Sequence, residues 1–160
     1  MKIHVTHSVG RGPTKLSAFD DALLSAGVAN YNLIRLSSVI PPKSKIIEHR
    51  GVINENFGKW GDKLYVVMAD QRVDIPNEEA WAGIGWVQDG KTGKGLFVEH
   101  EGHSKNTVER DIRDSLNKLV EGRKDVKFGE INMILSGATC NSEPVCALAI
   151  AVYESSGWTN

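Results

Sequence analysis

One segment of the chain anchors its interpretation: Asn30-Tyr31-Asn32-Leu33-Ile34-Arg35-Leu36-Ser37-Ser38-Val39-Ile40-Pro41-Pro42. Its apolar run predicts a β-strand, yet two consecutive serines interrupt the run and a Pro-Pro pair ends it. In one interpretation the serines are ordinary strand-end residues before an extended exit into the prolines. In the other, one hydroxyl lies beside a strained peptide bond and attacks its own backbone. Periodicity alone leaves both open.

Strand alternation places Asn32 and Ser38 on one face of this segment and Ser37 on the other. Six residues of extended strand separate Asn32 from Ser38, a span of about 20 Å at ~3.3 Å per residue. The two side chains therefore cannot serve one site within one straight strand. A bend or bulge would remove the difficulty.

Periodicity also predicts the elements around the segment. A strand over 2–8 precedes a helix with Thr14 as N-cap and Gly27 at its end, and its apolar face carries Leu16, Phe19, Leu23 and Ala26. Strands are predicted over 63–69, 80–88 and 94–101, the last two joined by a turn at Asp89-Gly90.

A long amphipathic helix is predicted to follow, capped by Ser104 and ending near Gly122. Its polar face is a mixed set of charges typical of a solvent-exposed surface. Strands over 131–137 and 145–153 close the chain, and the continuous apolar run of the second predicts a central place in a sheet. Strands outnumber helices, which predicts an α+β fold with mostly antiparallel sheet.

Composition excludes several functional classes. With 41% hydrophobic residues and no Pro/Gly/Ser-rich linker, residues 1–160 are expected to form a single domain. The chain has 19 basic and 20 acidic residues without a basic cluster, which disfavours nucleic-acid and membrane partners. No apolar run is long enough for a signal peptide or a membrane span, so a cytoplasmic protein is expected. Cys140 and Cys146 are interpreted as buried side chains near a turn, in preference to a disulfide or metal pair.

The strand that ends in Val98-Glu99-His100-Glu101-Gly102 contains a candidate general acid. Desolvation of Glu99 by apolar neighbours would raise its pKa and let the carboxyl keep a proton near neutrality. The alternative is an exposed glutamate on the polar side of a sheet. His100, Glu101 and His103 also suggest a metal site, but histidines three apart on a strand that turns at Gly102 do not share a face. No metal is therefore predicted.

Three blocks of the sequence, in this order, resemble the pyruvoyl-dependent arginine decarboxylase family, and the similarity extends from about residue 9 to about residue 153. The most specific part is Asn32-Leu33-Ile34-Arg35-Leu36-Ser37-Ser38-Val39-Ile40-Pro41-Pro42. The blocks are residues 16–27, 30–42 and 98–102. The resemblance implies a four-layer αββα sandwich. It also implies homotrimers with active sites at subunit interfaces, and whether two trimers pair into a hexamer stays open.

The resemblance further implies self-cleavage. Ser38 Oγ attacks the Ser37 carbonyl, and the resulting ester breaks by β-elimination into a β chain, 1–37, and an α chain, 38–160. Ser38 becomes a covalent pyruvoyl group, the cofactor, which supplies the electron sink that decarboxylation needs. Glu99 is the implied proton donor.

Three further residues are expected to contribute to the site. Asp20 is the implied partner of the substrate guanidinium, which a carboxylate binds through two parallel hydrogen bonds, and Leu23 lies near it as a second substrate-binding residue. The alternative for Asp20 is a solvated helix carboxylate. Asn32 is expected to donate to a carbonyl or oxyanion, and its alternative is an ordinary amide paired with backbone.

L-Arginine conversion to agmatine is the expected reaction, with lysine, ornithine and histidine as alternative substrates. The chain departs from the family's pattern at Asp21, Ala29, Tyr31 and His100, and an added carboxylate favours cationic substrates. An unprocessed, non-catalytic trimeric binding protein is the second alternative, and a metallohydrolase is the third. The same reaction would serve polyamine synthesis or acid resistance, and the sequence does not choose between them.

Overall fold

The computed structural model describes residues 1–159, and the chain begins with a strand, a helix and three short strands. They are β1 (Lys2–Arg11), α1 (Lys15–Ala26), β2 (Asn32–Arg35), β3 (Val39–Ile40) and β4 (Lys45–Glu48). Longer elements follow: β5 (Lys63–Val73), β6 (Glu79–Gln88), β7 (Gly95–Gly102), α2 (Lys105–Glu121), β8 (Asn132–Thr139) and β9 (Val145–Ser156).

The strands form two sheets, one of five strands and one of four. Sheet A has the order β2-β5-β9-β1-β4, and sheet B has the order β3-β7-β6-β8. The long strands pair antiparallel, whereas the short edge strands β2 and β4 pair parallel with β5 and β1. As the continuous apolar run predicts, β9 is the central strand of sheet A.

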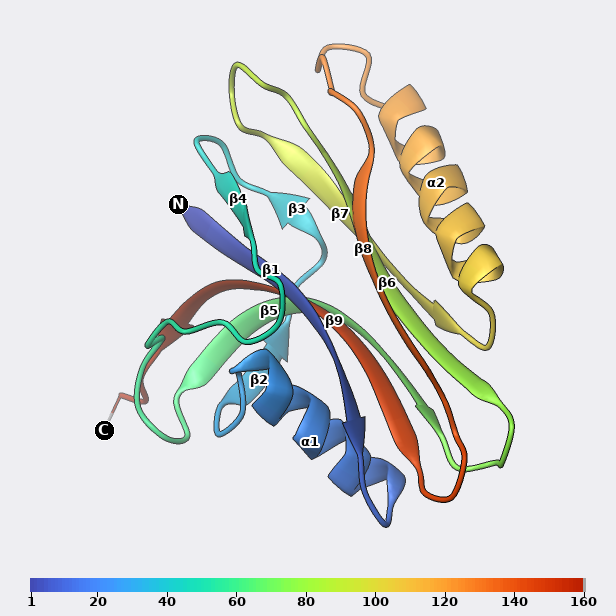
Figure 1. Cartoon of the computed structure of the whole chain (residues 1–160). Helices are drawn as coiled ribbons and strands as arrows, with labels where there is room; N and C mark the ends of the chain where they lie inside the picture. The colour runs from blue at the N-terminus through green and yellow to red at the C-terminus, as the bar shows by residue number, and fades with distance from the viewer. Residues whose placement is uncertain (160) are drawn as a thin grey trace.

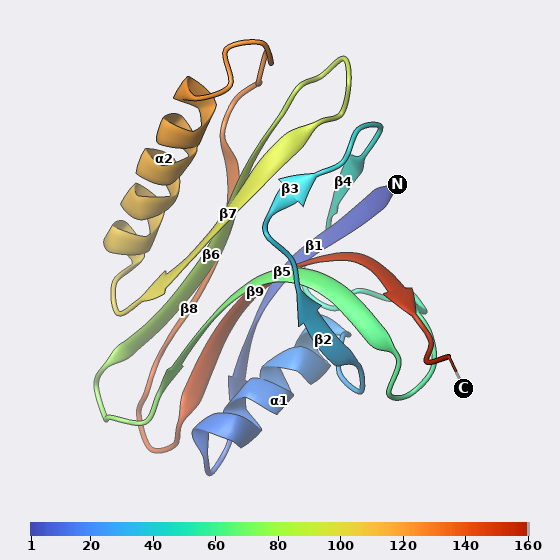
Figure 2. The same ribbon diagram turned by 180° about the vertical axis from the view of Figure 1, so that it is seen from behind.

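The prediction of one continuous strand through residues 30–42 is wrong. The segment forms the edge strand β2 of sheet A, leaves that sheet, and forms the edge strand β3 of sheet B. Figure 2 shows this crossover between the two sheets. Sequence periodicity cannot detect such a change of partner, because both halves are apolar and extended.

The helices cover the two outer faces of the paired sheets, α1 over sheet A and α2 over sheet B (Figure 1). This confirms the α+β class and the predicted αββα arrangement of layers. The hydrophobic core between the sheets includes Val67, Ile84, Phe97 and Tyr153. Each fully buried side chain of this kind contributes about 1.5–3 kcal/mol.

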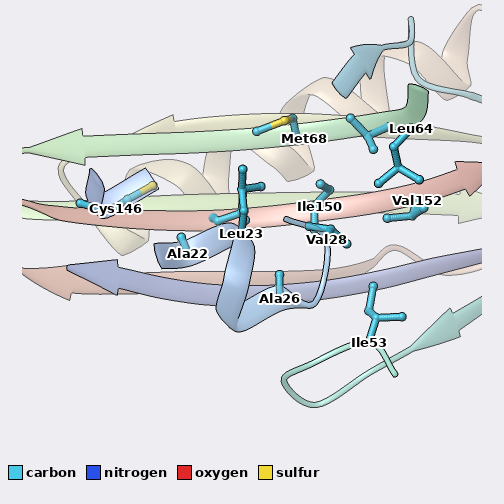
Figure 3. Packing of buried hydrophobic residues seen from close by; sticks show 13 residues of the cluster. Ala22, Leu23, Ala26, Val28, Ile53, Leu64, Met68, Cys146, Ile150 and Val152 are labelled. Atoms are coloured by element: carbon cyan, nitrogen blue, oxygen red, sulfur yellow. The ribbon is translucent and has the colours of Figure 1, made fainter. Parts of the chain in front are cut away.

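Each helix packs through its own apolar cluster. Under α1, Leu23 and Ala26 contact Met68 and Ile150 of sheet A (Figure 3). Under α2, Ile112 lies so close to β6 that a Cβ on Gly85 would come within 2.2 Å of its side chain. Any larger residue at position 85 would push α2 away from sheet B.

Both helices begin close to the predicted residues, but their caps differ. The Thr14 side chain accepts from Ser17 N–H in a capping box, and Gly27, at φ 79°, ends α1 in the left-handed conformation. Ser104 precedes α2 in an extended conformation, yet its side chain makes no capping hydrogen bond. Ser104 is therefore the N-cap residue, as predicted, but its hydroxyl does not make the capping hydrogen bond.

Two further findings concern elements outside the site. Cys140 and Cys146 are both buried free thiols, as predicted, and burial, followed by the Asp70 charge, raises the pKa of Cys146 to about 12. Within residues 1–159, no helix is both long and apolar enough to cross a membrane.

Candidate active site

The Ser37–Ser38 peptide bond lies in the crossover between the two sheets. Leu36 N–H donates to the Val66 carbonyl of sheet A (2.8 Å), and the Ser38 carbonyl accepts from Phe97 N–H of sheet B (2.8 Å). Ser38 itself has φ 66°, a left-handed conformation that is unfavourable for a residue with a side chain. The bond is therefore anchored on both sides, with local strain at its second residue.

The Ser38 hydroxyl points at the predicted general acid. Ser38 Oγ lies 2.9 Å from Glu99 Oε1 and 2.8 Å from Glu99 Oε2, and donates to the carboxylate. The two residues are 61 positions apart in the chain and come from the crossover and from β7. The alternative of an exposed glutamate without a partner does not describe Glu99.

Tyr153 of β9 supports the same crossover from the core. Its hydroxyl donates to the Val39 carbonyl over 3.0 Å, and its ring packs edge-on against Phe97. Burial, and then the nearby Glu99 charge, raises the pKa of Tyr153. The phenol therefore stays a neutral donor at physiological pH and fixes the residue that follows Ser38.

A pocket of about 610 Å³ opens beside Ser38 and Glu99. Its walls come from the crossover, from β7 and from one side of α2. They comprise Ser38, Phe97, Val98, Glu99, His100, Asp114, Ser115, Lys118 and Leu119. One side of α2, which includes Leu119 of its predicted apolar face, thus supplies a pocket wall that the sequence analysis did not predict. The detectable signal was the position of Ser115 and Leu119 beside the buried Ile112 and Leu116.

The two histidines near the pocket have separate partners. His100 Nε2 lies 2.8 Å from Ser115 Oγ, which ties β7 to α2. His103 Nδ1 lies 3.1 Å from the Glu79 carbonyl oxygen. Among residues 1–159 no group of three His, Cys, Asp or Glu side chains is arranged to hold a metal ion.

The structure does not bring the predicted substrate-binding residues to Ser38 within one chain. Asp20 is exposed on α1, on the outer face of sheet A, whereas α2 and the pocket lie on the side of sheet B. Leu23 is only 9% exposed and packs in the cluster beneath α1. For both residues the predicted contact with substrate stays a prediction.

Asn32 also lies away from the pocket, at the start of β2. Its side chain donates to the Gly61 carbonyl (2.6 Å), and its backbone N–H donates to the Asp62 carbonyl (2.8 Å). In the single chain its amide is therefore paired with backbone, which is the alternative that the sequence left open. Its catalytic role stays a prediction.

Comparison with known protein families identifies the family to which this site belongs. The family model described as pyruvoyl-dependent arginine decarboxylase matches residues 2–157. The chain belongs to this family. The pyruvoyl-dependent arginine decarboxylase of Pyrococcus horikoshii is 33% identical over 149 residues, which are 91% of this chain and 89% of that protein. The enzyme of the same name from Pyrococcus furiosus has the same identity and coverage.

Another relative matches a shorter part of the chain at higher sequence identity. The pyruvoyl-dependent arginine decarboxylase of Methanothermobacter thermautotrophicus is 50% identical over 48 residues, 30% of this chain and 32% of that protein. The family consists of lyases with a covalently bound pyruvoyl group. The residues of this chain fit such a group, because a Ser-Ser peptide bond with a strained second serine lies at a pocket beside a carboxyl group.

Proposed function

We propose that this chain is a pyruvoyl-dependent decarboxylase that converts L-arginine to agmatine and carbon dioxide. The observation that carries the proposal is the pair of hydrogen bonds from Ser38 Oγ to Glu99, at the Ser37–Ser38 bond of the crossover. A serine that only ends a strand does not require a hydrogen bond to a carboxylate from a distant strand. A serine nucleophile requires an adjacent base to accept its proton.

The proposed maturation begins at this pair. Glu99 accepts the Ser38 hydroxyl proton while Oγ attacks the Ser37 carbonyl carbon, and the peptide C–N bond breaks to leave an ester and a free amine. β-Elimination then removes the Ser38 Cα proton and expels the Ser37 carboxylate. Addition of water and loss of ammonia complete the pyruvoyl group. The products are a β chain, 1–37, and an α chain, 38–160.

The pyruvoyl group supplies an electron sink for the carbanion that decarboxylation produces. The chain's own residues do the rest. Phe97 and Val98 line the pocket with apolar surface, which limits water around the Glu99 carboxyl group. Glu99 holds a proton within reach of residue 38 and delivers it to the carbon that loses carbon dioxide. One carboxyl group thus serves as base in maturation and as acid in turnover.

Recognition of the cationic substrate is assigned to Asp20, with Leu23 beside it on α1, and Asn32 donates to a carbonyl or oxyanion. Since these residues lie apart from the pocket in one chain, the proposal includes a homotrimer. In it, α1 and β2 of one copy complete the Ser38–Glu99 pocket of another. A closed ring of this kind uses the same interface at every contact.

Intact mass spectrometry of the denatured protein is the first test. Two fragments separated between Ser37 and Ser38 are expected, the larger lighter by one ammonia than the hydrolysed peptide. Arginine, lysine, ornithine and histidine are then assayed side by side, and arginine is expected to give the highest kcat/KM. A higher value for another amino acid would change the substrate. One intact chain without activity would support the non-catalytic binding protein instead.

A further inference from the structure

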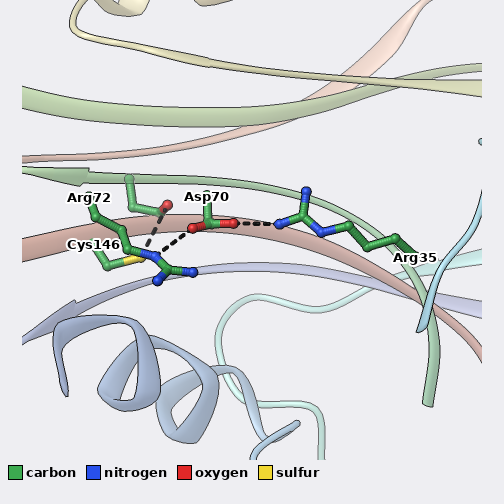
Figure 4. Close-up of polar contacts among 5 residues, drawn as sticks. Arg35, Asp70, Arg72 and Cys146 are labelled. Atoms are coloured by element: carbon green, nitrogen blue, oxygen red, sulfur yellow. Dashed lines mark hydrogen bonds and ion pairs between the residues drawn. The ribbon is translucent and has the colours of Figure 1, made fainter. Parts of the chain in front are cut away.

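Asp70 of β5 is a largely but not fully buried carboxylate with two arginine partners. It accepts from Arg35 Nη2 through Oδ2 and from Arg72 Nε through Oδ1, each over 2.7 Å. Its side chain is 10% exposed, against 60% for Arg35 and 31% for Arg72. Figure 4 shows Asp70 between the two guanidinium groups, with Cys146 beside Arg72. Nothing in the proposed chemistry at Ser38 and Glu99 uses this trio.

The first partner belongs to the segment that precedes the scissile bond. Arg35 is the last residue of β2 and lies two residues before Ser37. β2 is a four-residue edge strand paired only with β5, and such strand ends fray easily. Arg35 reaches along β5 to Asp70, past its own strand partner Val66. A charge-assisted bond at this position keeps the end of β2 on sheet A.

The second partner reaches the helix that carries Asp20. The Arg72 guanidinium lies over the Phe19 ring, 3.8 Å from its centroid. Phe19 directly precedes Asp20 and packs against the cluster beneath α1. Because Asp70 fixes Nε of Arg72, the flat side of the guanidinium is free to stack on the ring. This contact orients the turn of α1 that presents Asp20.

We infer that Asp70 is a positioning residue with two separate effects: through Arg35 it holds the Ser37 carbonyl for self-cleavage, and through Arg72 and Phe19 it holds Asp20 for substrate recognition. The inference rests on the proposed function. Attack by Ser38 Oγ requires the carbonyl at close range and in the right orientation, and small displacements slow such reactions strongly. Fraying of residues 35–37 would cause that displacement.

The experiment tests the two proposed effects of Asp70 separately. Arg35→Gln, Arg72→Gln and Asp70→Asn are prepared as full chains, with Arg113→Gln as control because its ion pair with Glu109 lies on exposed α2. Cleavage is followed over time by mass spectrometry, and KM for arginine is measured on fully cleaved protein. Arg35→Gln is expected to slow cleavage at least about tenfold, and Arg35→Lys to recover part of the rate.

Arg72→Gln is expected to leave the cleavage rate unchanged and to raise KM about three- to fivefold. Asp70→Asn is expected to show both effects. Equal cleavage rates in Arg35→Gln and the control, or an unchanged KM in Arg72→Gln, would overturn the inference. So would slowing of both Arg→Gln variants in proportion to a fall in Tm, since that pattern reports general destabilisation. An intact wild-type chain would instead overturn the proposed function, and the inference with it.

Discussion

The Ser38–Glu99 pocket and the outer face of sheet A differ in how complete they are within one chain. In the pocket, the serine and the carboxylate come from separate parts of the chain and are already hydrogen-bonded, and Tyr153 of β9 holds the adjacent Val39 carbonyl. On the outer face, Asp20 is exposed on α1, and on the edge strand β2 the Asn32 side chain is paired with the backbone of a neighbouring loop. The first region is assembled by folding, whereas the second reaches a pocket only in the proposed trimer.

This difference suggests that the pocket carries out bond cleavage and that the outer face of sheet A recognises the substrate. Bond cleavage requires atoms fixed within a few tenths of an ångström, which a folded core provides. Binding of an extended cationic side chain requires only a carboxylate at the right distance, and a second subunit can supply it. We therefore expect substitutions in the pocket to affect cleavage and kcat, and substitutions on α1 to affect KM.

The largest effect is expected for Ser38→Ala. This variant lacks the nucleophile, so the chain stays uncleaved and activity falls by at least about 10⁶-fold. Intact mass and a carbon dioxide release assay measure the two results. Ser37→Ala is the matched control, because it keeps the attacking hydroxyl and still cleaves, at least slowly. Rapid normal cleavage of Ser38→Ala would contradict the assignment.

Glu99→Gln tests the other half of the pocket. Because Glu99 is also the proposed base in maturation, this variant is expected to cleave more slowly than the wild type. In the fraction that has cleaved, loss of the proton donor is expected to lower kcat by about 10²–10⁴-fold, with KM little changed. Glu101→Gln, two residues further on β7 and exposed, is the control and should retain the wild-type kcat. A Glu99→Gln enzyme with wild-type kcat would show that the proton comes from elsewhere.

Asp20→Asn tests the outer face. Replacement of the carboxylate is expected to raise KM for arginine about 10- to 100-fold while cleavage proceeds at the wild-type rate. Asp111→Asn is the matched control, at a half-buried aspartate of α2 that pairs with Arg110. Steady-state kinetics and mass spectrometry give the two readouts. An unchanged KM would show that Asp20 does not recognise the substrate. It would also contradict the assignment of substrate recognition to the outer face of sheet A.

Mixed oligomers test whether the two regions meet across subunits. Glu99→Gln and Asp20→Asn chains are coexpressed with different tags, and the doubly tagged oligomers are assayed at low arginine concentration. With sites shared between neighbours, one of the three sites in each mixed trimer combines both intact residues, which is about one third of the sites. If both residues served one chain, every site would be defective, and the rate would be the mean of the two parents.

The smallest effect concerns the stability of sheet A. His4 of β1 is 8% exposed, and its Nδ1 lies 2.9 Å from Nε2 of His49. Burial, followed by the His49 charge, lowers the pKa of His4, an effect that Glu55 opposes and Lys2 adds to. The unfolded chain therefore takes up the proton first as pH falls below the ordinary value of 6.5.

The contribution of His4 to stability is consequently complete above that value and is lost as pH falls towards the lowered pKa. The Tm of the wild type is expected to fall by about 2 °C more between pH 7.5 and 5.5 than that of His4→Gln. His7→Gln on the same strand is the control and should follow the wild type. Parallel Tm profiles for His4→Gln and the wild type would contradict this expectation.

Much of the fold follows from local pattern. The Thr14 cap and the Gly27 end of α1 were predictable, because capping depends on residues within one or two turns. The apolar face of α1 was only partly predicted, since Leu16 is 70% exposed while Leu23 and Ala26 are buried. The continuous apolar run of β9 likewise predicted a central strand. The side-chain hydrogen bond expected at the Ser104 cap does not form, and strand β4 was missed; both were marginal local signals that tertiary packing decided.

The candidate site divides in the same way. The sequence by itself determined the chemical parts: two adjacent serines before Pro-Pro, a glutamate on a later strand and an aspartate on an amphipathic helix. Only the tertiary structure decided that the serine segment leaves one sheet for the other, and that α2 forms a wall of the pocket. It also decided that Asp20 faces away from Ser38. The reason is physical: residue types carry chemistry locally, whereas contacts between residues 61 positions apart arise from packing of the whole core.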